Sequence, residues 1–474
     1  MLYHQHFSIH IILKLFFYTF ALKQIIMKRL TFITLLLVFF SLNTFSQDTI
    51  REYWKNKQQR SEGIKINDKK EGKWTYWYQN GKKWSEGLYK NDEQTGFWSF
   101  WSETGKKQTE YFIENGSYKS WYENGNLESE GQNKNKLHTG DWKFYHQNGR
   151  LKRTCTFVDG KLQGYFVEYH DNDQKMQIGI FIDDKLNGYS TWWTREGTKE
   201  MEGKSIDDLQ DSTWNFYHAN GKLASTGAFL EGKPNGMWTY FYEDGKIWKK
   251  GNFESGKRVG KWTAWFEDGK KQREGSFEND REVGFWEQWY KNGQLEYCGY
   301  FTSGLMSGNW TAWYYNGEKK YETQYKDGKR EGKSTFWFEN GITMNEGNYK
   351  NDLKTGDWKE WAITGKLTQT GTYKEGKKTG YFVFYNKMGG KDREQEFFED
   401  KTNGKWVEYY PNGKKAAEGF NVNRLKEGIW TNWDSKGNIV LQVQYKAGLK
   451  IKTIKDASKE DPNNPTKKKT IDTF

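Results

Sequence analysis

Aromatic residues at regular spacing are the side chains in this sequence best suited to bind a ligand. Aromatic residues make up 18% of the chain, about half of its 35% hydrophobic content. Exposed Trp and Tyr rings can stack on sugar rings or hold cationic groups. A first ring column lies two residues after a recurring Gly, and a second lies three residues further on. The Trp residues that we consider for binding are Trp74, Trp98, Trp142, Trp238, Trp262, Trp286 and Trp310 in the first column, and Trp265, Trp289, Trp313, Trp337 and Trp361 in the second.

Histidine and cysteine give weaker signals for metal or disulfide chemistry. His146, His170 and His218 share one place in the repeated pattern and could form a metal ladder, but other repeats have Tyr or Phe there. Two His without a third ligand make a poor site, so we expect surface ring positions and no metal. Cys155 and Cys298 lie six repeats apart, roughly 50 Å in a stack of strands, which predicts that they stay unpaired. Cys155 stands where other repeats have Gly, which predicts a packed thiol.

Carboxylates recur with the same period, which favours a structural column over a catalytic pair. Catalytic carboxylates are unique and paired at a defined distance. No phosphate-binding loop, nucleophile elbow or metal motif stands out. The sequence therefore predicts neither an enzyme nor a cofactor. The recurring acids are Glu86, Glu130, Glu202, Glu274, Glu346 and Glu418.

Composition and charge limit the class of partner. The formal net charge is +12, but Lys alternates with Asp and Glu along the chain, which indicates a solvated surface. A nucleic-acid interface would need clustered basic residues, so we expect none. With 50 Gly, 4 Pro and few aliphatic residues, a thin repeat structure with a core of stacked rings is favoured over ordinary globular domains.

A 24-residue period decides the fold class. One step is four residues short, and sixteen repeats run from residue 72 to 451. We expect the opening Gly to be required because a ring of the neighbouring repeat crosses the backbone there. The opening position is Gly72, Gly96, Gly116, Gly140, Gly164, Gly188, Ser212, Gly236, Gly260, Gly284, Gly308, Gly332, Gly356, Gly380, Gly404 and Gly428.

Each repeat reads as two short strands joined by Gly-containing turns. Asn-Gly and Asp-Gly pairs such as Asn80-Gly81 and Asp244-Gly245 suit turns with positive φ, and Asp173 replaces the turn Gly in one repeat. A third ring column, including Tyr89 and Phe253, lies in the second strand. An offset of three places the first two ring columns on opposite faces of a regular strand, unless a bulge realigns them.

The pattern Gly-x-Trp-x-x-Trp/Tyr-Tyr-x-Asn-Gly-Lys, followed by Glu-Gly-x-Tyr/Phe and Gly-Lys-x-x-Gly, resembles the MORN repeat from about Gly72 to Gly448. It is most similar to the bacterial variant found in the YwqK-type antitoxin family. The resemblance implies an all-β, elongated array of stacked antiparallel hairpins. It also implies a non-catalytic scaffold for protein–protein interaction, and for that family the neutralising of a partner toxin.

The two ends of the chain differ from the repeats. Met27 begins a charged, then apolar segment that ends at Ser46, the pattern of a cleaved export signal, with residues 1–26 an upstream extension. An uncleaved leader that contacts the membrane is the alternative. Residues 47–71 are expected to form an N-terminal cap, and residues 452–474 a flexible basic tail.

Three classes of function follow from these features, and one of them is a structural or envelope-associated protein that contacts lipid. A long repetitive surface on an exported protein, in the periplasm, at the outer membrane or outside the cell, suits an unknown protein partner. A glycan or cell-wall binding module is the alternative, and it requires that one aromatic column be open to solvent.

Overall fold

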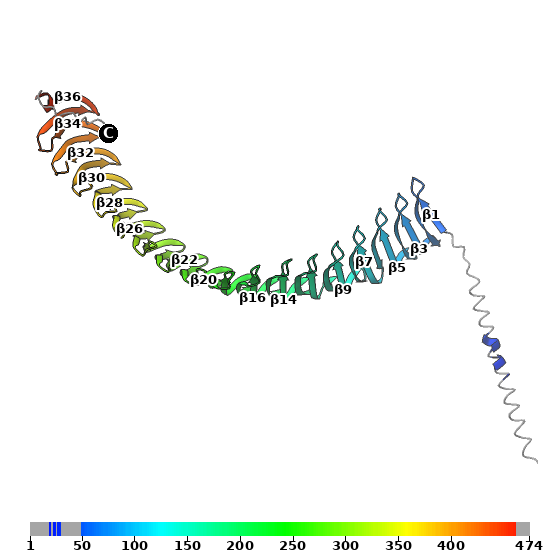
Figure 1. Ribbon diagram of the computed structural model, residues 1–474. Helices are drawn as coiled ribbons and strands as arrows, with labels where there is room; N and C mark the ends of the chain where they lie inside the picture. The colour runs from blue at the N-terminus through cyan, green and yellow to red at the C-terminus, as the bar shows by residue number, and fades with distance from the viewer. Residues whose placement is uncertain (1–18, 20–21, 25, 30–48, 461–474) are drawn as a thin grey trace, which may run out of the picture. The chain divides into compact units, whose positions relative to one another are not determined.

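The computed structural model describes residues 19, 22–24, 26–29 and 49–460. The predicted export signal falls almost wholly outside these residues. In the described part, no helix is both long and apolar enough to cross a bilayer. The chain divides into two compact units, Met1–Lys185 and Leu186–Phe474, and in each the hairpins follow one another in sequence order (Figure 1).

The first unit is an all-β array in which the described strands pair antiparallel with their neighbours in sequence. Its strands are β1 (Thr49–Tyr53), β2 (Gln59–Ile66), β3 (Lys69–Trp77), β4 (Lys83–Lys90), β5 (Glu93–Trp101), β6 (Lys107–Phe112), β7 (Asn115–Trp121), β8 (Leu127–Lys134), β9 (Leu137–Tyr145), β10 (Leu151–Val158), β11 (Lys161–Leu162), β12 (Gly164–Tyr169) and β13 (Lys175–Ile182). β11 and β12 are one interrupted strand, since both pair with β10.

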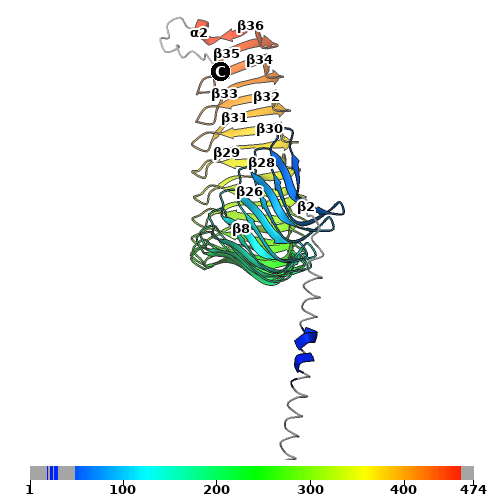
Figure 2. The same cartoon turned by 90° about the vertical axis from the view of Figure 1, so that its right-hand side faces the viewer.

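The second unit repeats the same pairing, and its turns lie along both margins of the strands (Figure 2). Its strands are β14 (Lys185–Trp193), β15 (Lys199–Ile206), β16 (Leu209–Tyr217), β17 (Leu223–Leu230), β18 (Lys233–Phe241), β19 (Ile247–Glu254), β20 (Lys257–Trp265), β21 (Lys271–Glu278), β22 (Arg281–Trp289), β23 (Leu295–Thr302), β24 (Leu305–Trp313), β25 (Lys319–Lys326), β26 (Lys329–Trp337), β27 (Thr343–Lys350), β28 (Leu353–Trp361), β29 (Leu367–Lys374), β30 (Lys377–Tyr385), β31 (Lys391–Phe398), β32 (Lys401–Tyr409), β33 (Lys415–Val422), β34 (Leu425–Trp433), β35 (Ile439–Lys446) and β36 (Leu449–Asp456), followed by helix α2 (Ala457–Glu460). The predicted all-β hairpin array is confirmed.

Two kinds of turn join the strands, and both use positive φ. The loop after the ring-rich strand closes with the Gly81 N–H donating to the Tyr78 carbonyl at 3.0 Å, and Gly81 has a φ of 80°. Asp173 takes this place with a φ of 70°, so its predicted left-handed conformation is confirmed. The other turn has two residues with positive φ, such as Asn91 (52°) and Asp92 (71°), as in type I′ hairpins.

A β-bulge explains the opening glycine. Between β19 and β20 the register shifts from Lys250 to Asn252, so Gly251 lies opposite residues 260–262. Gly260 has a φ of 60°, and a Cβ added there would meet nothing within 4 Å. The expectation that a ring crosses the opening glycine is therefore wrong, because the requirement comes from the backbone conformation. In the short repeat, β6 and β7 pair without a bulge, and Gly116 has no positive φ.

The ring of the neighbouring repeat instead crosses the glycine of the second strand, which we call the floor glycine. A Cβ added to Gly251 would lie 2.2 Å from Cδ2 of Trp262. Real Cβ atoms do not approach so closely, so only glycine allows the indole to lie flat on the backbone. The floor glycines with this contact to a first-column ring are Gly63, Gly87, Gly131, Gly203, Gly227, Gly251, Gly275, Gly299, Gly347, Gly371 and Gly419.

The indole N–H also has a fixed partner, which explains why this ring is usually Trp. Trp262 Nε1 donates to the carbonyl of Asn252, the residue after the floor glycine, at 3.1 Å. This carbonyl lies at the bulge, where the strand register shifts. Nine further first-column tryptophans, which we call ladder tryptophans, donate to the equivalent carbonyl. Buried polar groups need such partners, so the indole both fills the core and satisfies the backbone.

Strands continue to both ends of the described array. Residues 49–66 form a hairpin whose Gly63 lies under Trp74, so the cap contains the second strand of a repeat. At the other end β36 continues to Asp456 and pairs with β35, so the tail begins later than residue 452. An antiparallel strand completes the last hairpin there. The remainder of the predicted tail, residues 461–474, lies outside the described residues.

Both cysteines are free thiols, as predicted. Cys155 is buried at a floor-glycine position, and burial raises the pKa of its thiol to about 11. The residue that would cover it is Phe166 instead of Trp, and both side chains pack in one core cluster. Thr323 at another floor position is hydrogen-bonded to Ser334, which replaces the Trp. A larger floor residue therefore goes together with a smaller covering residue in these two repeats.

Gly251→Ala should destabilise strands β19–β21 by about 1–3 kcal/mol, because the added methyl group forces Trp262 off the backbone. Trp262→Ser removes the same contact, so the double variant should cost less than the sum of the two single changes. Native-state hydrogen exchange of the amides in these strands measures the local opening free energy. Additive effects would contradict the packing of indole on glycine.

Candidate functional site

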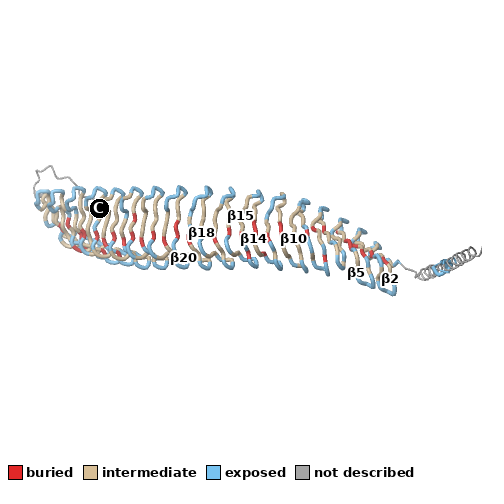
Figure 3. The backbone as a smooth tube through the Cα atoms, turned by 90° about the horizontal axis from the view of Figure 1, so that it is seen from below, coloured by how far each residue is buried: buried red, intermediate tan, exposed pale blue. Residues whose placement is uncertain are grey.

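The first-column tryptophans are core residues. Trp74, Trp98 and Trp142 are each 1% exposed, and Trp238, Trp262, Trp286 and Trp310 are also buried. Figure 3 shows the buried residues as short stretches that recur at a similar place in successive strands of each unit. The face of the strands that carries these tryptophans, which we call the ladder face, therefore offers no open row of first-column indoles for stacking on a sugar.

The third ring column completes the ladder. The Phe277 ring meets Trp286 edge to face with centroids 5.0 Å apart, and meets Trp262 at 6.2 Å. The same alternation continues through Phe301 and Trp310 at 5.0 Å. Such edge-to-face pairs stabilise beyond the area that they bury. The spacing of the first and third columns is therefore explained by packing between repeats.

The second ring column lies on the opposite face, which we call the outer face, because the register shift between Ala264 and Trp265 adds a residue to the partner strand and not to the strand that carries the ring. Thr263 and Trp265 lie on this face, because Thr263 pairs with Glu274 while Trp262 pairs with Gly275. Trp265, Trp289, Trp313, Trp337 and Trp361 are all half-buried. A lysine of the preceding repeat lies over many of these rings, as Lys271 does over Trp289 with Nζ 5.4 Å from the ring centroid. The rings are thus partly covered by the chain itself.

The recurring glutamates hold these lysines. Glu274 forms ion pairs with Lys261 at 2.9 Å and Lys271 at 3.2 Å on the outer face. Where the outer ring is Tyr, its hydroxyl donates to the glutamate, as Tyr145 does to Glu130 at 2.7 Å. The Tyr145 hydroxyl holds the pKa of Glu130 below its usual value. Burial, and then Glu130, raise the pKa of Tyr145 to about 12. The glutamate therefore links one repeat to the next where it is present, whereas Lys250 and Cys298 take its position in the repeats on either side of Glu274.

The histidine column has the same linking role as the Tyr residues that replace it. His146 Nε2 lies 2.9 Å from the Tyr169 carbonyl, and His218 Nε2 lies 3.0 Å from the Phe241 carbonyl. Tyr78 places its hydroxyl on the equivalent carbonyl of the next repeat at 2.9 Å. Among the described residues no group of three His, Cys, Asp or Glu side chains could hold a metal ion.

Sequence reasoning missed a second link, made by the turn asparagines. Asn292 Oδ1 accepts from the Gln294 N–H within its own turn, while Nδ2 donates to the Tyr315 carbonyl of the next repeat at 2.9 Å. Asp can make the first bond but not the second. The preference for Asn over Asp in this column is the signal that could have revealed the link.

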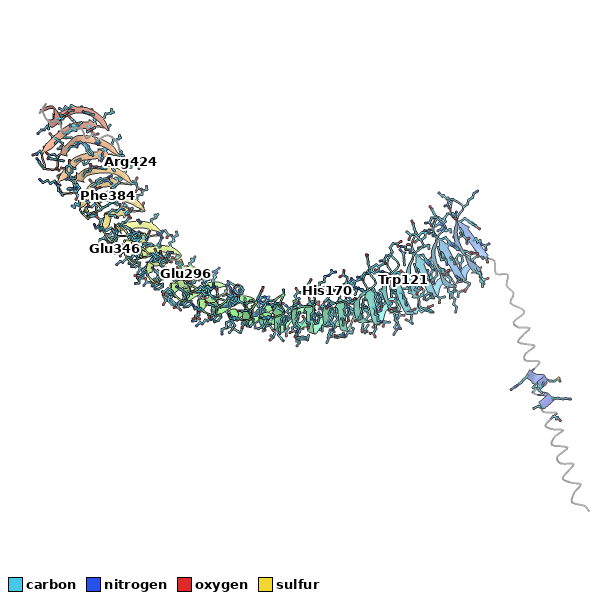
Figure 4. The ribbon with its side chains drawn as sticks, in the orientation of Figure 1. Trp121, His170, Glu296, Glu346, Phe384 and Arg424 are labelled. Atoms are coloured by element: carbon cyan, nitrogen blue, oxygen red, sulfur yellow. The ribbon has the colours of Figure 1, made fainter. Side chains whose placement is uncertain are left out.

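Exposed apolar side chains vary from one repeat to the next. On the outer face Phe285 pairs with Tyr300, with ring centroids 5.0 Å apart, and the two residues are 44% and 50% exposed. The next repeat has the polar pair Asn309 and Gln324 at the same positions. Figure 4 shows side chains along both faces of the strands. The exposed surface is therefore irregular, although the core beneath it repeats.

Comparison with family models gives an independent reading of the repeats. Nine segments match the model described as MORN repeat variant: residues 70–91, 114–135, 139–159, 234–255, 258–279, 306–327, 330–351, 402–421 and 426–447. The chain carries MORN repeats. The matches include both the ladder tryptophan and the glycine-containing turns in most of the MORN segments. No curated protein sequence matches the chain.

The solved structures that match the chain do so with low sequence identity and low TM-scores. The crystal structure of TcdB2-TccC3 is 11% identical over 84% of this chain, with a TM-score of 0.15. The structure of the Photorhabdus luminescens Tc holotoxin pore is 9% identical over 84% of this chain, with a TM-score of 0.15. The chain spans about a quarter of the length of these structures, namely 27% and 23%.

Glu130→Gln should lower the pKa of Tyr145 from about 12, but not to its ordinary value near 10, because burial remains. The folded state favours the neutral phenol. Its contribution to stability is therefore complete below about pH 10 and is lost as the pH rises through about 12. Titration of the tyrosine Cζ resonances, assigned with Tyr145→Phe, measures the shift. Glu202→Gln is the matched control and should leave Tyr145 unchanged, and an unchanged pKa in Glu130→Gln would contradict the link.

Proposed function

We propose that this protein is a non-catalytic scaffold that binds a partner protein through its outer face, outside the cytoplasm. The observation that carries the proposal is the contrast between a constant core and a variable exposed surface. The ladder tryptophans and floor glycines recur. By contrast, the outer-face pair is Lys261 and Ser276 in one repeat and Phe285 and Tyr300 in the next. Exposed apolar patches with polar surroundings are typical of protein-binding sites.

A regular glycan is less well matched by this surface. A polymer with identical units would be bound best by the same platform in each repeat. The recurring rings are either buried, like Trp286, or half-buried beneath a lysine, like Trp289. The observations thus favour a protein partner whose surface matches an irregular row of side chains.

The cellular setting rests on the sequence. The segment from Met27 to Ser46 has the charged and apolar regions of an export signal, which supports a place in the periplasm, at the outer membrane or outside the cell. The resemblance to YwqK-type antitoxins supports a partner that the scaffold neutralises. On this proposal the protein has neither a catalytic residue nor a cofactor.

The double variant Phe285→Lys/Tyr300→Lys should abolish capture of the partner, because it replaces the apolar pair with two desolvation-sensitive charges. Asn309→Lys/Gln324→Lys is the matched control, with the same added charge at the same positions one repeat later. Photo-crosslinking of the full chain in the envelope fraction, followed by mass spectrometry, measures capture. We expect one protein to be crosslinked by the wild type and the control but not by the apolar-pair variant.

Equal crosslinking by both variants would contradict a role for the outer-face pair. Saturable binding of cell-wall fragments, retained by both variants and without a crosslinked protein, would favour the glycan alternative instead.

A further inference from the structure

In two repeats, three rings on the ladder face surround the side chain of one lysine, which stands four residues before the ladder ring. In the first of these, Lys70 Nζ lies 4.7 Å from the ring centroid of Trp74, 5.3 Å from that of Tyr76 and 5.0 Å from that of Tyr89. The same ammonium group donates to the Tyr76 hydroxyl at 2.9 Å. Rings attract a cation through the negative potential of their faces. This ring trio therefore holds an ammonium group.

A second ring trio, in the other unit, holds its lysine in the same way. Lys378 Nζ lies 5.1 Å from the ring centroid of Phe382, 5.5 Å from that of Phe384 and 5.3 Å from that of Phe397. Burial lowers the pKa of Lys378, which is a cost of placing the ammonium there. In both trios the lysine stands four residues before the ladder ring. The chain has thus built one kind of cation site twice.

The ring trio of Trp214, Phe216 and Phe229 has the same register but no cation. Its ring centroids lie 6.2, 6.3 and 6.4 Å apart, and the residue four before Trp214 is Gln210. Among the described residues no Lys or Arg lies over any of these three rings. Phe216, Phe229 and Gln210 are each half-buried and so keep some exposed surface. Trp214 itself is buried, and Gln210 occupies the sequence position at which the other two trios have a lysine.

Other ring sets on this face differ from this one. His138 already lies on Trp142, with centroids 3.7 Å apart, and Lys249 lies over Tyr240 at 4.6 Å. Near Gln94 the short repeat sets its rings in a row, since Tyr111 stacks on Phe100 instead of closing a trio. Among the described residues, the Trp214 trio is therefore a three-ring site with no charged or imidazole side chain over any of its rings.

Lysine is the cation that such a trio selects within this chain. Arg258 lies over a single ring, Phe277, and donates to Asp280. Arg330 likewise lies over Tyr349 and donates to Asp352. Arg153 and Arg393 each lie over two rings, so in the described residues it is only lysine that lies over all three rings of a trio.

We propose that Trp214, Phe216 and Phe229 bind a lysine side chain of a partner protein, which displaces the carboxamide of Gln210. The inference rests on the proposed function as a protein-binding scaffold, and it adds a second contact on the ladder face, opposite the face that carries Phe285 and Tyr300. A lysine that enters this site contacts three rings and loses part of its hydration, the condition in which cation–π attraction is strongest.

The experiment follows the tryptophan indole ¹⁵N–H resonances of the full chain during titration with N-acetyl-lysine-N-methylamide. We expect saturable shifts at Trp214 and at Trp238, whose ring lies 5.1 Å from Phe229, and none with the norleucine analogue. Gln210→Lys should weaken the binding at least tenfold, because the chain then supplies its own ammonium. Lys70→Gln should create a second site, reported by Trp74. Gln324→Lys on the outer face is the charge-matched control and should change nothing.

Three results would overturn the inference. They are the absence of shifts at Trp214, shifts that Gln210→Lys leaves intact, and shifts caused by choline but not by the lysine diamide, which would assign the site to quaternary ammonium compounds. If any of them occurs while the wild type still crosslinks its partner through Phe285 and Tyr300, the scaffold proposal stands and only the lysine anchor fails. If the shifts occur but no partner is crosslinked, the anchor site stands and the outer-face proposal fails.

Discussion

The fold depends on the contact between each ladder indole and the floor glycine of the preceding repeat. A single-layered sheet has no second layer to cover its apolar face, so its core must form within the layer. The bulge opposite Gly251 makes room for Trp262, and the indole N–H bonds the Asn252 carbonyl at the same place. One residue thus fills the core, satisfies a backbone acceptor and fixes the register between neighbouring repeats.

In two repeats that lack the floor glycine, the floor residue and the residue that covers it have changed together. Cys155 and Thr323 replace floor glycines, and the covering residues are the smaller Phe166 and Ser334. In the repeat of Cys155, Arg153 also lies over the covering ring, with its guanidinium carbon 5.1 Å from the centroid of Phe166. Gln395 also holds a floor position, is buried, and pairs with Trp406, so a smaller covering residue accompanies a larger floor residue in the repeats of Cys155 and Thr323 but not in that of Gln395.

The sequence predicted the period, the hairpins, the turns and the packed thiol of Cys155, because glycine and aromatic spacing report directly on turns and packing. It assigned the wrong cause to the opening glycine, since spacing alone does not show whether Gly260 serves a positive φ or a close contact. It also left the two tryptophan columns undecided between one face and two. That choice depends on the position of the bulge, which involves two strands and is not encoded in either one alone. The lysine that covers Trp289 comes from the preceding repeat, so its role follows from strand pairing instead of from local sequence.

In such an array, side chains that recur in each repeat serve the stability of the stack. Side chains that differ between repeats are free to contact another molecule. Columns that link one repeat to the next, such as the ladder ring and the floor glycine beneath it, recur at most junctions because neighbouring repeats pack through them. A side chain that differs between repeats, such as Tyr300 against Gln324, makes no such recurring link. The same reasoning applies to Gln210, which leaves its ring trio without the lysine that Lys70 and Lys378 supply elsewhere. Positions at which one repeat departs from a satisfied pattern are thus the positions at which a second molecule can complete it.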